Sequence, residues 1–329
     1  MCTRVVYLGP DRTVITARTM DWVEDIRTNL WALPRGIAHN GAAGPRSLTW
    51  TSRYGSVVAT GYDAGTADGM NEAGLVVSML YLTEAQYGAD DGSRPLLSIS
   101  LWAQYVLDCF ATVAEAVGAL APEPFVILAP AIPNGSPASL HLAISDASGD
   151  SAIFEFVGGR LTIHHGRQFQ VMTNSPVYDE QLALNRYWES IGGLAWLPGT
   201  NRAADRFARA SFYVNAIPQT SDTQLSLAGV LGVIRNVSVP LGITTPGQPN
   251  ISSTRWRSVA DHKQRVYYFD SATSPNTFWV PLGDLALGEG AAVEKLVLGS
   301  TQFYSGNAAG NFEATMPFEF LPAPGGVGA

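Results

Sequence analysis

The chain opens with the run Met1-Cys2-Thr3-Arg4-Val5-Val6-Tyr7-Leu8, and an alternating run follows over residues 12–18, which leads into Arg18-Thr19-Met20-Asp21-Trp22. A Gly-Pro-Asp turn signal separates the two runs, so together they predict a β-hairpin. In a hairpin, the end of the second strand lies beside the start of the first. We therefore expect Arg18 and Asp21 to return to Cys2, and we expect the fold to be organised around this corner.

A cysteine directly after the initiator methionine can act as a nucleophile that carries its own base. Removal of Met1 would leave Cys2 with a thiol of unperturbed pKa about 8.5 and an α-amine of pKa about 8. The amine can take the thiol proton without a histidine, as in N-terminal threonine nucleophiles. A thiolate also needs a nearby cation, which Arg18 would supply. The alternative is an ordinary surface hairpin in which a cysteine happens to follow the initiator.

The composition is that of a globular protein with many turns and short strands. The chain has 329 residues, of which 46% are hydrophobic and 15% charged, together with 33 glycines and 20 prolines. This is enough for one large core or two modest ones. Because the composition changes sharply nowhere and no repeat is present, we expect a single domain over residues 1–329.

Charge and hydropathy argue against several kinds of partner. The net charge of −8 comes without a basic tract, which argues against nucleic acid. No apolar run reaches the ~18 residues of a membrane span. With two cysteines, Cys2 and Cys109, a disulfide framework is not the organising device. Cys109 falls in an apolar, helix-like run and is expected to be a buried, unreactive thiol.

The start of the sequence leaves the cellular compartment open. No signal peptide precedes Cys2. A free Cys2 amine requires either that Met1 is trimmed or that Met1 stands in place of a natural leader. The first alternative implies a cytoplasmic protein and the second a periplasmic one.

Strand and helix signals occur in separate clusters, which favours an α+β layered domain over a parallel βαβ sheet. The segment Asp68-Gly69-Met70-Asn71-Glu72-Ala73-Gly74 is predicted to be a turn-rich connection. Thr112, with Glu115 three residues later, is a predicted helix N-cap.

Beyond the first hairpin, strands are predicted over 54–61, 75–81, 140–145, 152–157, 161–165, 169–173, 253–259, 265–269 and 277–280. Helices are predicted over 97–110, 112–120, 178–190, 202–215 and 224–235, and Pro/Gly-rich loops over 122–137, 240–249 and 322–329.

Several short stretches, in this order along nearly the whole chain, resemble the choloylglycine hydrolase family, which includes conjugated bile salt hydrolases and penicillin V acylases. Each stretch alone is a weak signal, and the ordered set is a strong one. The stretches are Cys2-Thr3-Arg4, Arg18-Thr19-Met20-Asp21-Trp22, Asp68 to Leu75, Thr173-Asn174-Ser175-Pro176, Leu197-Pro198-Gly199, Asp205-Arg206-Phe207 and Val266-Tyr267-Tyr268-Phe269.

The resemblance implies a four-layer αββα N-terminal-nucleophile hydrolase that cleaves a linear amide without a metal or an organic cofactor. It implies that Cys2 is the nucleophile, that Arg18 lies beside the thiol, and that Asp21 orients the α-amine. The Asn174 side-chain amide and the Tyr81 backbone N–H would hold the oxyanion, and Arg206 would be a second active-site arginine. Family members are often tetramers, so a homo-oligomer is expected by resemblance.

Each of these residues also has an ordinary structural interpretation. Asn174 before Ser-Pro could cap a turn, Arg206 could lie on a solvated helix face, and Asp21 could mark a strand-to-loop junction. At the position of Tyr81, many bile-salt-cleaving members carry Asn and penicillin V acylases often carry Tyr. His164 and His165 are adjacent on a predicted strand and face opposite sides, so we expect no metal site there.

We expect the substrate to be a small amphipathic amide held against apolar side chains. Met20, Trp22, Leu82 and Tyr87 cluster around the expected site in sequence and could stack on a phenoxy ring or a steroid face. Conjugated bile salts and penicillin V are the leading substrates. Acyl-homoserine lactones are an alternative, and a binding scaffold that holds an amphipathic anion without cleaving it is a further one.

Overall fold

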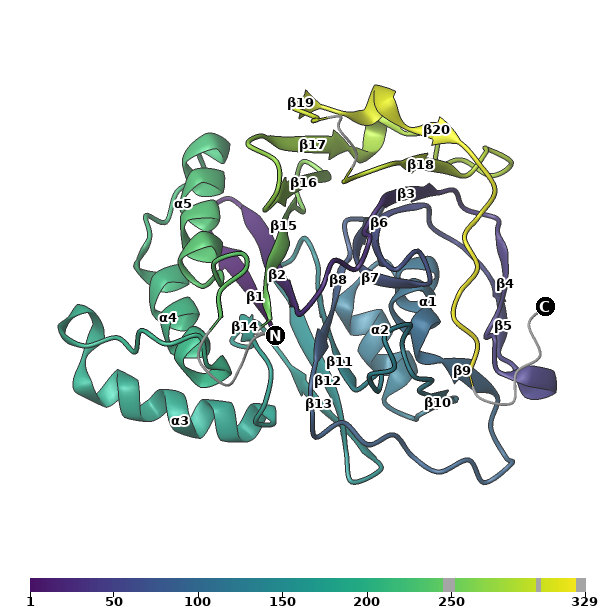
Figure 1. Cartoon of the computed structure of the whole chain (residues 1–329), viewed down its shortest axis with the longest axis horizontal. Helices are drawn as coiled ribbons and strands as arrows, with labels where there is room; N and C mark the ends of the chain where they lie inside the picture. The colour runs from purple at the N-terminus through teal and green to yellow at the C-terminus, as the bar shows by residue number, and fades with distance from the viewer. Residues whose placement is uncertain (245–251, 300–302, 324–329) are drawn as a thin grey trace.

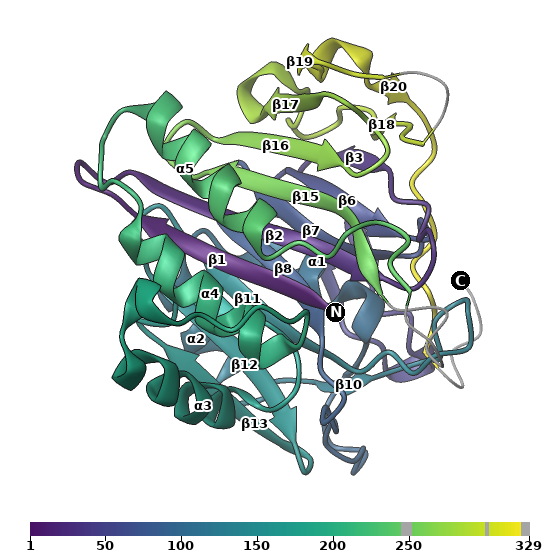
Figure 2. The ribbon, with the colours of Figure 1, turned by 60° about the vertical axis from the view of Figure 1, so that its left-hand side comes forward.

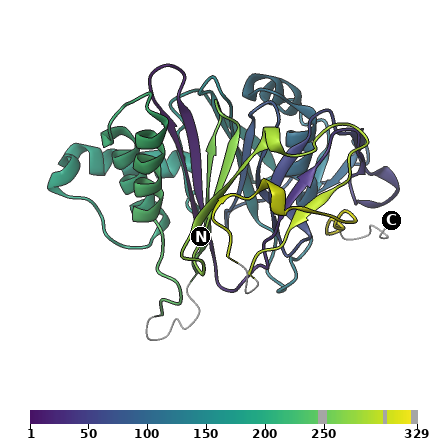
Figure 3. The same ribbon diagram turned by 90° about the horizontal axis from the view of Figure 1, so that it is seen from above.

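Two β-sheets lie face to face at the centre of the protein and are covered on both outer faces by helices (Figures 1 and 3). The computed structural model describes residues 1–244, 252–299 and 303–323. Helices α4 and α5 pack on one sheet with α3 against α4, and α1 and α2 pack on the other sheet. The predicted α+β, four-layer αββα architecture is therefore confirmed. The predicted loop 240–249 and tail 322–329 extend outside the described residues.

The seven-stranded sheet has the order β14-β1-β2-β15-β16-β17-β19. Its first two long strands are the predicted hairpin, in which Cys2 pairs with Met20 and Arg4 with Arg18. Figure 2 shows these two strands side by side, in purple, with the N-terminus at the start of β1. The strands are β1 (Cys2–Leu8), β2 (Val14–Trp22), β14 (Val171–Met172), β15 (Ser253–Asp261), β16 (Val266–Ser271), β17 (Thr277–Pro281) and β19 (Gly306–Asn307).

The nine-stranded sheet has the order β13-β12-β11-β8-β7-β6-β3-β18-β20. Its strands are β3 (Leu30–Leu33), β6 (Ser56–Gly61), β7 (Gly65–Asn71), β8 (Val76–Tyr81), β11 (Leu140–Ser145), β12 (Ser151–Val157), β13 (Arg160–His165), β18 (Glu294–Leu296) and β20 (Glu313–Ala314). Two small additional sheets pair β4 (Ala38–Asn40) with β5 (Thr49–Thr51), and β9 (Leu96–Ser98) with β10 (Val126–Leu128).

The helices follow the predicted apolar spacing closely. They are α1 (Trp102–Cys109), α2 (Val113–Leu120), α3 (Tyr178–Ile191), α4 (Ala203–Ala216) and α5 (Thr223–Asn236). The N-cap prediction at Thr112 is confirmed, because its side chain accepts from the Glu115 N–H. The predicted helix over 97–110 is shorter than expected, since its first residues belong to β9 and a 3₁₀ turn.

The prediction that 68–74 is a connection was wrong, because 65–71 form strand β7 in the middle of the nine-stranded sheet. A Cβ on Gly69 would lie 2.7 Å from the Val57 carbonyl oxygen and 3.1 Å from a methyl of Leu107 in α1. This glycine therefore lets a helix approach the sheet closely and does not mark a turn. The actual turn ends at Gly74, which has φ +88°.

The site lies at the layer between the two sheets. One apolar cluster fills that layer and continues to α4 and α5, and a second fills the space between the nine-stranded sheet and α1 and α2. Asp68 of β7 joins the two sheets, because Oδ1 accepts hydrogen bonds from Ser258 (2.8 Å) and Tyr267 (2.6 Å). Cys2 belongs to the cluster between the sheets.

Candidate active site

The thiol of Cys2, the first residue of β1, is buried between the sheets, with 3% of the residue exposed. Arg18 Nη2 donates to Cys2 Sγ at 3.2 Å, and Met20 Sδ lies 3.9 Å from the same sulfur. The hairpin register explains this contact, since Cys2 pairs with Met20 and Arg18 is two residues earlier on the same strand. The predicted return of the second strand to Cys2 is therefore confirmed as geometry.

Arg18 is fully buried and fixed from several directions. Its Nη1 donates to the Ala67 carbonyl oxygen at 2.8 Å and lies 3.9 Å from Asp68 Oδ2. Its guanidinium carbon lies over the Trp256 ring, 5.0 Å from the centroid. A buried cation in hydrogen-bond contact with a thiol favours the thiolate form.

The backbone nitrogen of Cys2 points at Asn174. The chain is described with Met1 attached, so this nitrogen is an amide, and its N–H donates to Asn174 Oδ1 at 2.6 Å. The Met1 amine donates to the Asp21 carbonyl oxygen at 2.8 Å. Burial lowers the pKa of that amine below its ordinary value, against opposing contributions from Cys2 and Asp21. The start of the chain is thus held inside the protein.

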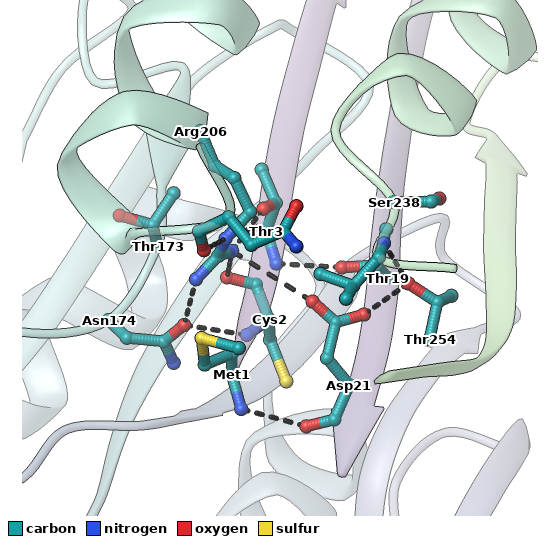
Figure 4. Close-up of polar contacts among 12 residues, drawn as sticks. Met1, Cys2, Thr3, Thr19, Asp21, Thr173, Asn174, Arg206, Ser238 and Thr254 are labelled. Atoms are coloured by element: carbon teal, nitrogen blue, oxygen red, sulfur yellow. Dashed lines mark hydrogen bonds and ion pairs between the residues drawn. The ribbon is translucent and has the colours of Figure 1, made fainter. Parts of the chain in front are cut away.

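The Asp21 carboxylate is fully buried beside Cys2 (Figure 4). Oδ1 accepts from the Thr254 hydroxyl at 2.7 Å, a contact that follows from the pairing of Thr254 with Asp21 between β15 and β2. Oδ2 has no hydrogen-bond donor among the residues that the structure describes, although Arg206 Nη1 lies 3.9 Å away. A buried acceptor without a donor is unfavourable, so this oxygen can take a further N–H group.

Arg206 of α4 is fully buried, so the solvated-face interpretation is wrong. Nη1 donates to the Cys2 carbonyl oxygen and to Thr3 Oγ1, and Nη2 donates to Asn174 Oδ1 at 2.7 Å. Burial lowers the pKa of Arg206, while Asp21 and Cys2 act in the opposite direction. Arg206 therefore ties the first strand to the turn that carries Asn174.

Tyr81 and Asn174 meet on the other side of Cys2. Asn174 Nδ2 donates to the Tyr81 carbonyl oxygen at 2.6 Å. Leu140, opposite Tyr81 on β11, has both its N–H and its carbonyl bonded to the Tyr87 hydroxyl. The next residue, Leu82, donates to Ser139 of the connection before β11. Because backbone groups alternate in direction along a strand, those of Tyr81 point away from β11 and towards Asn174.

Two cavities open beside Cys2. One, of about 130 Å³, is apolar and includes Cys2, Met20, Trp22, Tyr62, Met79 and Ile132 in its lining. The other, of about 640 Å³, is wider and includes Met1, Trp22, Tyr81, Asn174 and Arg202. Trp22 and Tyr81 line both cavities, and their ring centroids lie 5.7 Å apart. An extended molecule could therefore occupy both cavities, with Trp22 and Tyr81 where the two cavities meet and Cys2 in the wall of the apolar one.

Of the four predicted substrate-binding residues, Met20 and Trp22 line the apolar cavity and Leu82 and Tyr87 do not. Leu82 is fully buried, and as the neighbour of Tyr81 it faces the opposite side of the strand. The Tyr87 hydroxyl is bound to Leu140, and its ring packs on Phe156. The structure thus places Leu82 in the protein interior and Tyr87 in a half-buried position outside the apolar cavity.

Sequence reasoning missed Tyr62 and Thr254. The Tyr62 hydroxyl accepts from Trp22 Nε1 at 3.1 Å and donates to Glu24 at 2.5 Å, so it orients the tryptophan in the apolar cavity. No local pattern marks Tyr62. Thr254 lies at the start of a predicted strand, and pairing of that strand with β2 would have placed it opposite Asp21.

The part of the chain that the structure describes contains no candidate metal site, because no group of three or more His, Cys, Asp or Glu side chains there could hold a metal ion. No described helix is long and apolar enough to cross a membrane. Cys109 is partly buried, and burial raises the pKa of its thiol to about 12.

Comparison with known proteins identifies the family. Residues 2–297 match the model for linear amide C–N hydrolases of the choloylglycine hydrolase family. The chain is 49% identical to a penicillin V acylase of Pectobacterium atrosepticum, over 97% of this chain and 92% of the relative. A solved penicillin V acylase from Agrobacterium tumefaciens is 58% identical, with TM-score 0.91 over 98% of this chain and 100% of that one.

A more distant structure shares the fold. The C2A mutant of the conjugated bile acid hydrolase from Clostridium perfringens is 21% identical, with TM-score 0.78 over 93% of this chain and 98% of that one. The family match covers most of the chain and includes Cys2, Arg18, Asp21, Asn174 and Arg206. The chain therefore belongs to the choloylglycine hydrolase family and is an amidohydrolase that acts on linear amide C–N bonds.

Proposed function

We propose that this enzyme hydrolyses penicillin V and related N-acyl amides, with Cys2 as an N-terminal nucleophile. One observation carries the proposal: the Cys2 sulfur accepts a hydrogen bond from buried Arg18 at 3.2 Å, at the edge of an apolar cavity. Both relatives of high identity are penicillin V acylases. The phenoxyacetyl group of penicillin V is an aryl group of the kind that such a cavity favours.

The proposed reaction begins with removal of Met1, which makes the Cys2 nitrogen a free α-amine. This amine takes the thiol proton, and the thiolate attacks the amide carbonyl carbon to form a tetrahedral intermediate. The amine then returns its proton to the leaving nitrogen as the C–N bond breaks, which leaves a thioester on Cys2. Water, activated by the same amine, attacks the thioester and releases the acid. The unpartnered Asp21 Oδ2 supports a role in accepting an N–H of the α-amine.

We assign the oxyanion to the Tyr81 backbone N–H and Asn174 Nδ2. The support is that both groups lie on one side of β8, since the Tyr81 backbone groups point towards Asn174 and away from β11. Donors fixed in this way before substrate arrives are the main source of transition-state stabilisation in acyl transfer. Arg206, which donates to Asn174 Oδ1, would keep the amide nitrogen of Asn174 turned towards the substrate.

Conjugated bile salts form the second candidate substrate class, and acyl-homoserine lactones the third. Among the described residues, no charged side chain lines the apolar cavity, so a steroid face or an alkyl chain also suits it chemically. A catalytically inactive binding scaffold is opposed by the family match and by the close contacts of Cys2, Arg18 and Arg206.

The decisive experiment compares initial rates on penicillin V, glycocholate, taurocholate and a long-chain acyl-homoserine lactone under one set of conditions. We expect the highest kcat/KM on penicillin V. Intact mass spectrometry with a slow substrate should show an acyl adduct that maps to Cys2. Turnover without such an adduct, or N-terminal sequencing of active enzyme that finds Met1 in place, would contradict the proposed chemistry.

We also propose that the enzyme is a homo-oligomer, with a tetramer as the expected state. The segment between α3 and α4 exposes Leu194 (79%) and Trp196 (63%), which are large apolar side chains of the kind found at subunit contacts. Light scattering coupled to size-exclusion chromatography measures the state directly. A monomer at micromolar concentration would contradict this proposal. Separating cells of the native host into periplasmic and cytoplasmic fractions, and measuring the enzyme in each, would distinguish the cytoplasmic from the periplasmic alternative.

A further inference from the structure

A buried histidine–glutamate pair lies behind Asn174. His141 on β11 and Glu155 on the neighbouring strand β12 are 1% and 2% exposed, and His141 Nδ1 lies 2.9 Å from Glu155 Oε1. The other ring nitrogen, Nε2, lies 3.0 Å from the carbonyl oxygen of Thr173, the residue before Asn174. No step of the proposed reaction uses the side chain of His141 or of Glu155.

The contacts of His141 fix its protonation state. A backbone carbonyl oxygen can only accept a hydrogen bond, and an ionised carboxylate can only accept as well. Both ring nitrogens of His141 therefore have to donate, which requires the doubly protonated imidazolium. Burial alone would raise the pKa of Glu155, but the nearby His141 and His164 rings and the Tyr178 N–H lower it to about 2, so the carboxylate is ionised.

Glu155 also reaches the far side of the turn that carries Asn174. Its Oε2 accepts from the Tyr178 N–H at 2.9 Å, at the first residue of α3. The pair thus holds both ends of the segment 173–178, one through Thr173 and the other through Tyr178. Gln181 adds a third contact by donating to the Asn174 carbonyl oxygen at 2.9 Å.

We propose that His141 and Glu155 are positioning residues that hold the Asn174 amide in place for the oxyanion, an inference that rests on the proposed oxyanion role of Asn174. They touch neither the thiol nor the substrate cavities among the described residues. Their loss should therefore slow amide hydrolysis and leave the reactivity of the thiol unchanged. Oxyanion donors act on the tetrahedral intermediate, which is why the effect should appear in kcat and not in KM.

The charged and titratable groups around the pair are His164, with Nε2 3.8 Å from Glu155 Oε2, and Asp179, with Oδ1 3.8 Å from His164 Nδ1. The Tyr178 ring packs on His164 at 4.7 Å.

The test uses Glu155→Gln, which keeps the size of the side chain and removes its charge. We expect kcat on penicillin V to fall roughly 10- to 100-fold, less than the full loss of an oxyanion donor, with KM within about twofold. The rate of Cys2 alkylation by iodoacetamide, followed by peptide mass mapping to separate it from Cys109, should stay within about twofold of wild type. Alkylation is a displacement at carbon that forms no oxyanion, so it reports on the thiol alone.

The matched control is Asp150→Asn, which breaks the exposed pair of Asp150 with His165 on β13 (2.8 Å). This control should change neither rate. An unchanged kcat in Glu155→Gln would overturn the proposal, and so would an equal fall in hydrolysis and alkylation, because that pattern indicates general damage to the fold. If wild type alkylates normally but cleaves none of the tested amides, the proposed function fails instead.

A second measurement does not depend on activity. The chain has five histidines, so ¹⁵N-histidine NMR spectra are simple, and His141→Asn assigns the signal. We expect both ring nitrogens of His141 to show the protonated, imidazolium shift at pH 7. Burial lowers the pKa of His39 and of His262 to about 4, so these two rings serve as neutral references. A neutral tautomer at His141 would overturn the proposal even if Glu155→Gln fails to fold.

Discussion

On the thiol side of the site, Cys2, Arg18 and Asp21 all come from one hairpin of the seven-stranded sheet. On the proposed oxyanion side, Tyr81 belongs to β8 of the nine-stranded sheet and Asn174 to the turn after β14, 93 positions later. Local strand pairing fixes the first group. Long-range packing fixes the second, through Arg206 and the His141–Glu155 pair. The two sides can therefore be disturbed separately.

The largest expected effect is on the thiol side, from Cys2→Ser. A hydroxyl is a much weaker nucleophile than a thiolate near neutral pH, so kcat/KM should fall by more than about 1000-fold. Circular dichroism and thermal melting should remain close to wild type, because Ser fits the same buried space. Near-normal turnover in this variant would exclude Cys2 as the nucleophile.

On the oxyanion side, Asn174→Ala should lower kcat by roughly 100- to 1000-fold, the typical cost of losing one oxyanion donor. Iodoacetamide should still alkylate Cys2 at close to the wild-type rate. Comparing amide hydrolysis with Cys2 alkylation in this variant tests directly whether Asn174 and the thiol can be disturbed independently. A parallel loss of alkylation would show that Asn174 also controls the thiol, through its contact with the Cys2 nitrogen.

Arg18→Gln should slow the alkylation of Cys2 as well as amide hydrolysis. The fixed cation at 3.2 Å from the sulfur favours the thiolate, so its removal should leave less thiolate at neutral pH. Alkylation by iodoacetamide at pH 7 should therefore slow by roughly 10- to 100-fold. The alkylation rate measures this effect. A rate that matches wild type would mean that Arg18 only fills space beside the sulfur.

The same difference between local strand pairing and long-range packing explains which elements of the fold the sequence could predict. The hairpin, the Thr112 cap and helices α3–α5 depend on local patterns and were predicted within a few residues. Strand β7 was missed because its glycine serves close packing against α1, which only the folded protein reveals. Strands β18–β20 are two or three residues long, too short for a periodic signal.

The site divides in the same way. Contact between Cys2 and Arg18 followed from the hairpin, whereas Asn174, Arg206 and Tyr81 were found only by resemblance to a family. Spacing along the chain carries no information about which distant turn reaches a given strand. For the same reason closeness to Tyr81 in sequence did not bring Leu82 and Tyr87 into the lining of the apolar cavity.

Trp22 offers the smallest and most selective test, because it is the side chain at which the two sides meet. It extends from β2 of the hairpin, lines both cavities and packs near the Tyr81 ring. In Trp22→Leu the cavity stays apolar but loses aromatic contact area, so KM for penicillin V should rise by roughly 3- to 10-fold, which corresponds to the ~1 kcal/mol typical of an aromatic pair. The matched control is Trp279→Leu on β17, an exposed tryptophan that lines neither cavity, which should leave KM unchanged. Because neither the thiol nor the oxyanion donors change, kcat should stay within about twofold. A fall in kcat with constant KM would mean that Trp22 acts on the reacting groups themselves, and the two sides would then not be separable at this residue.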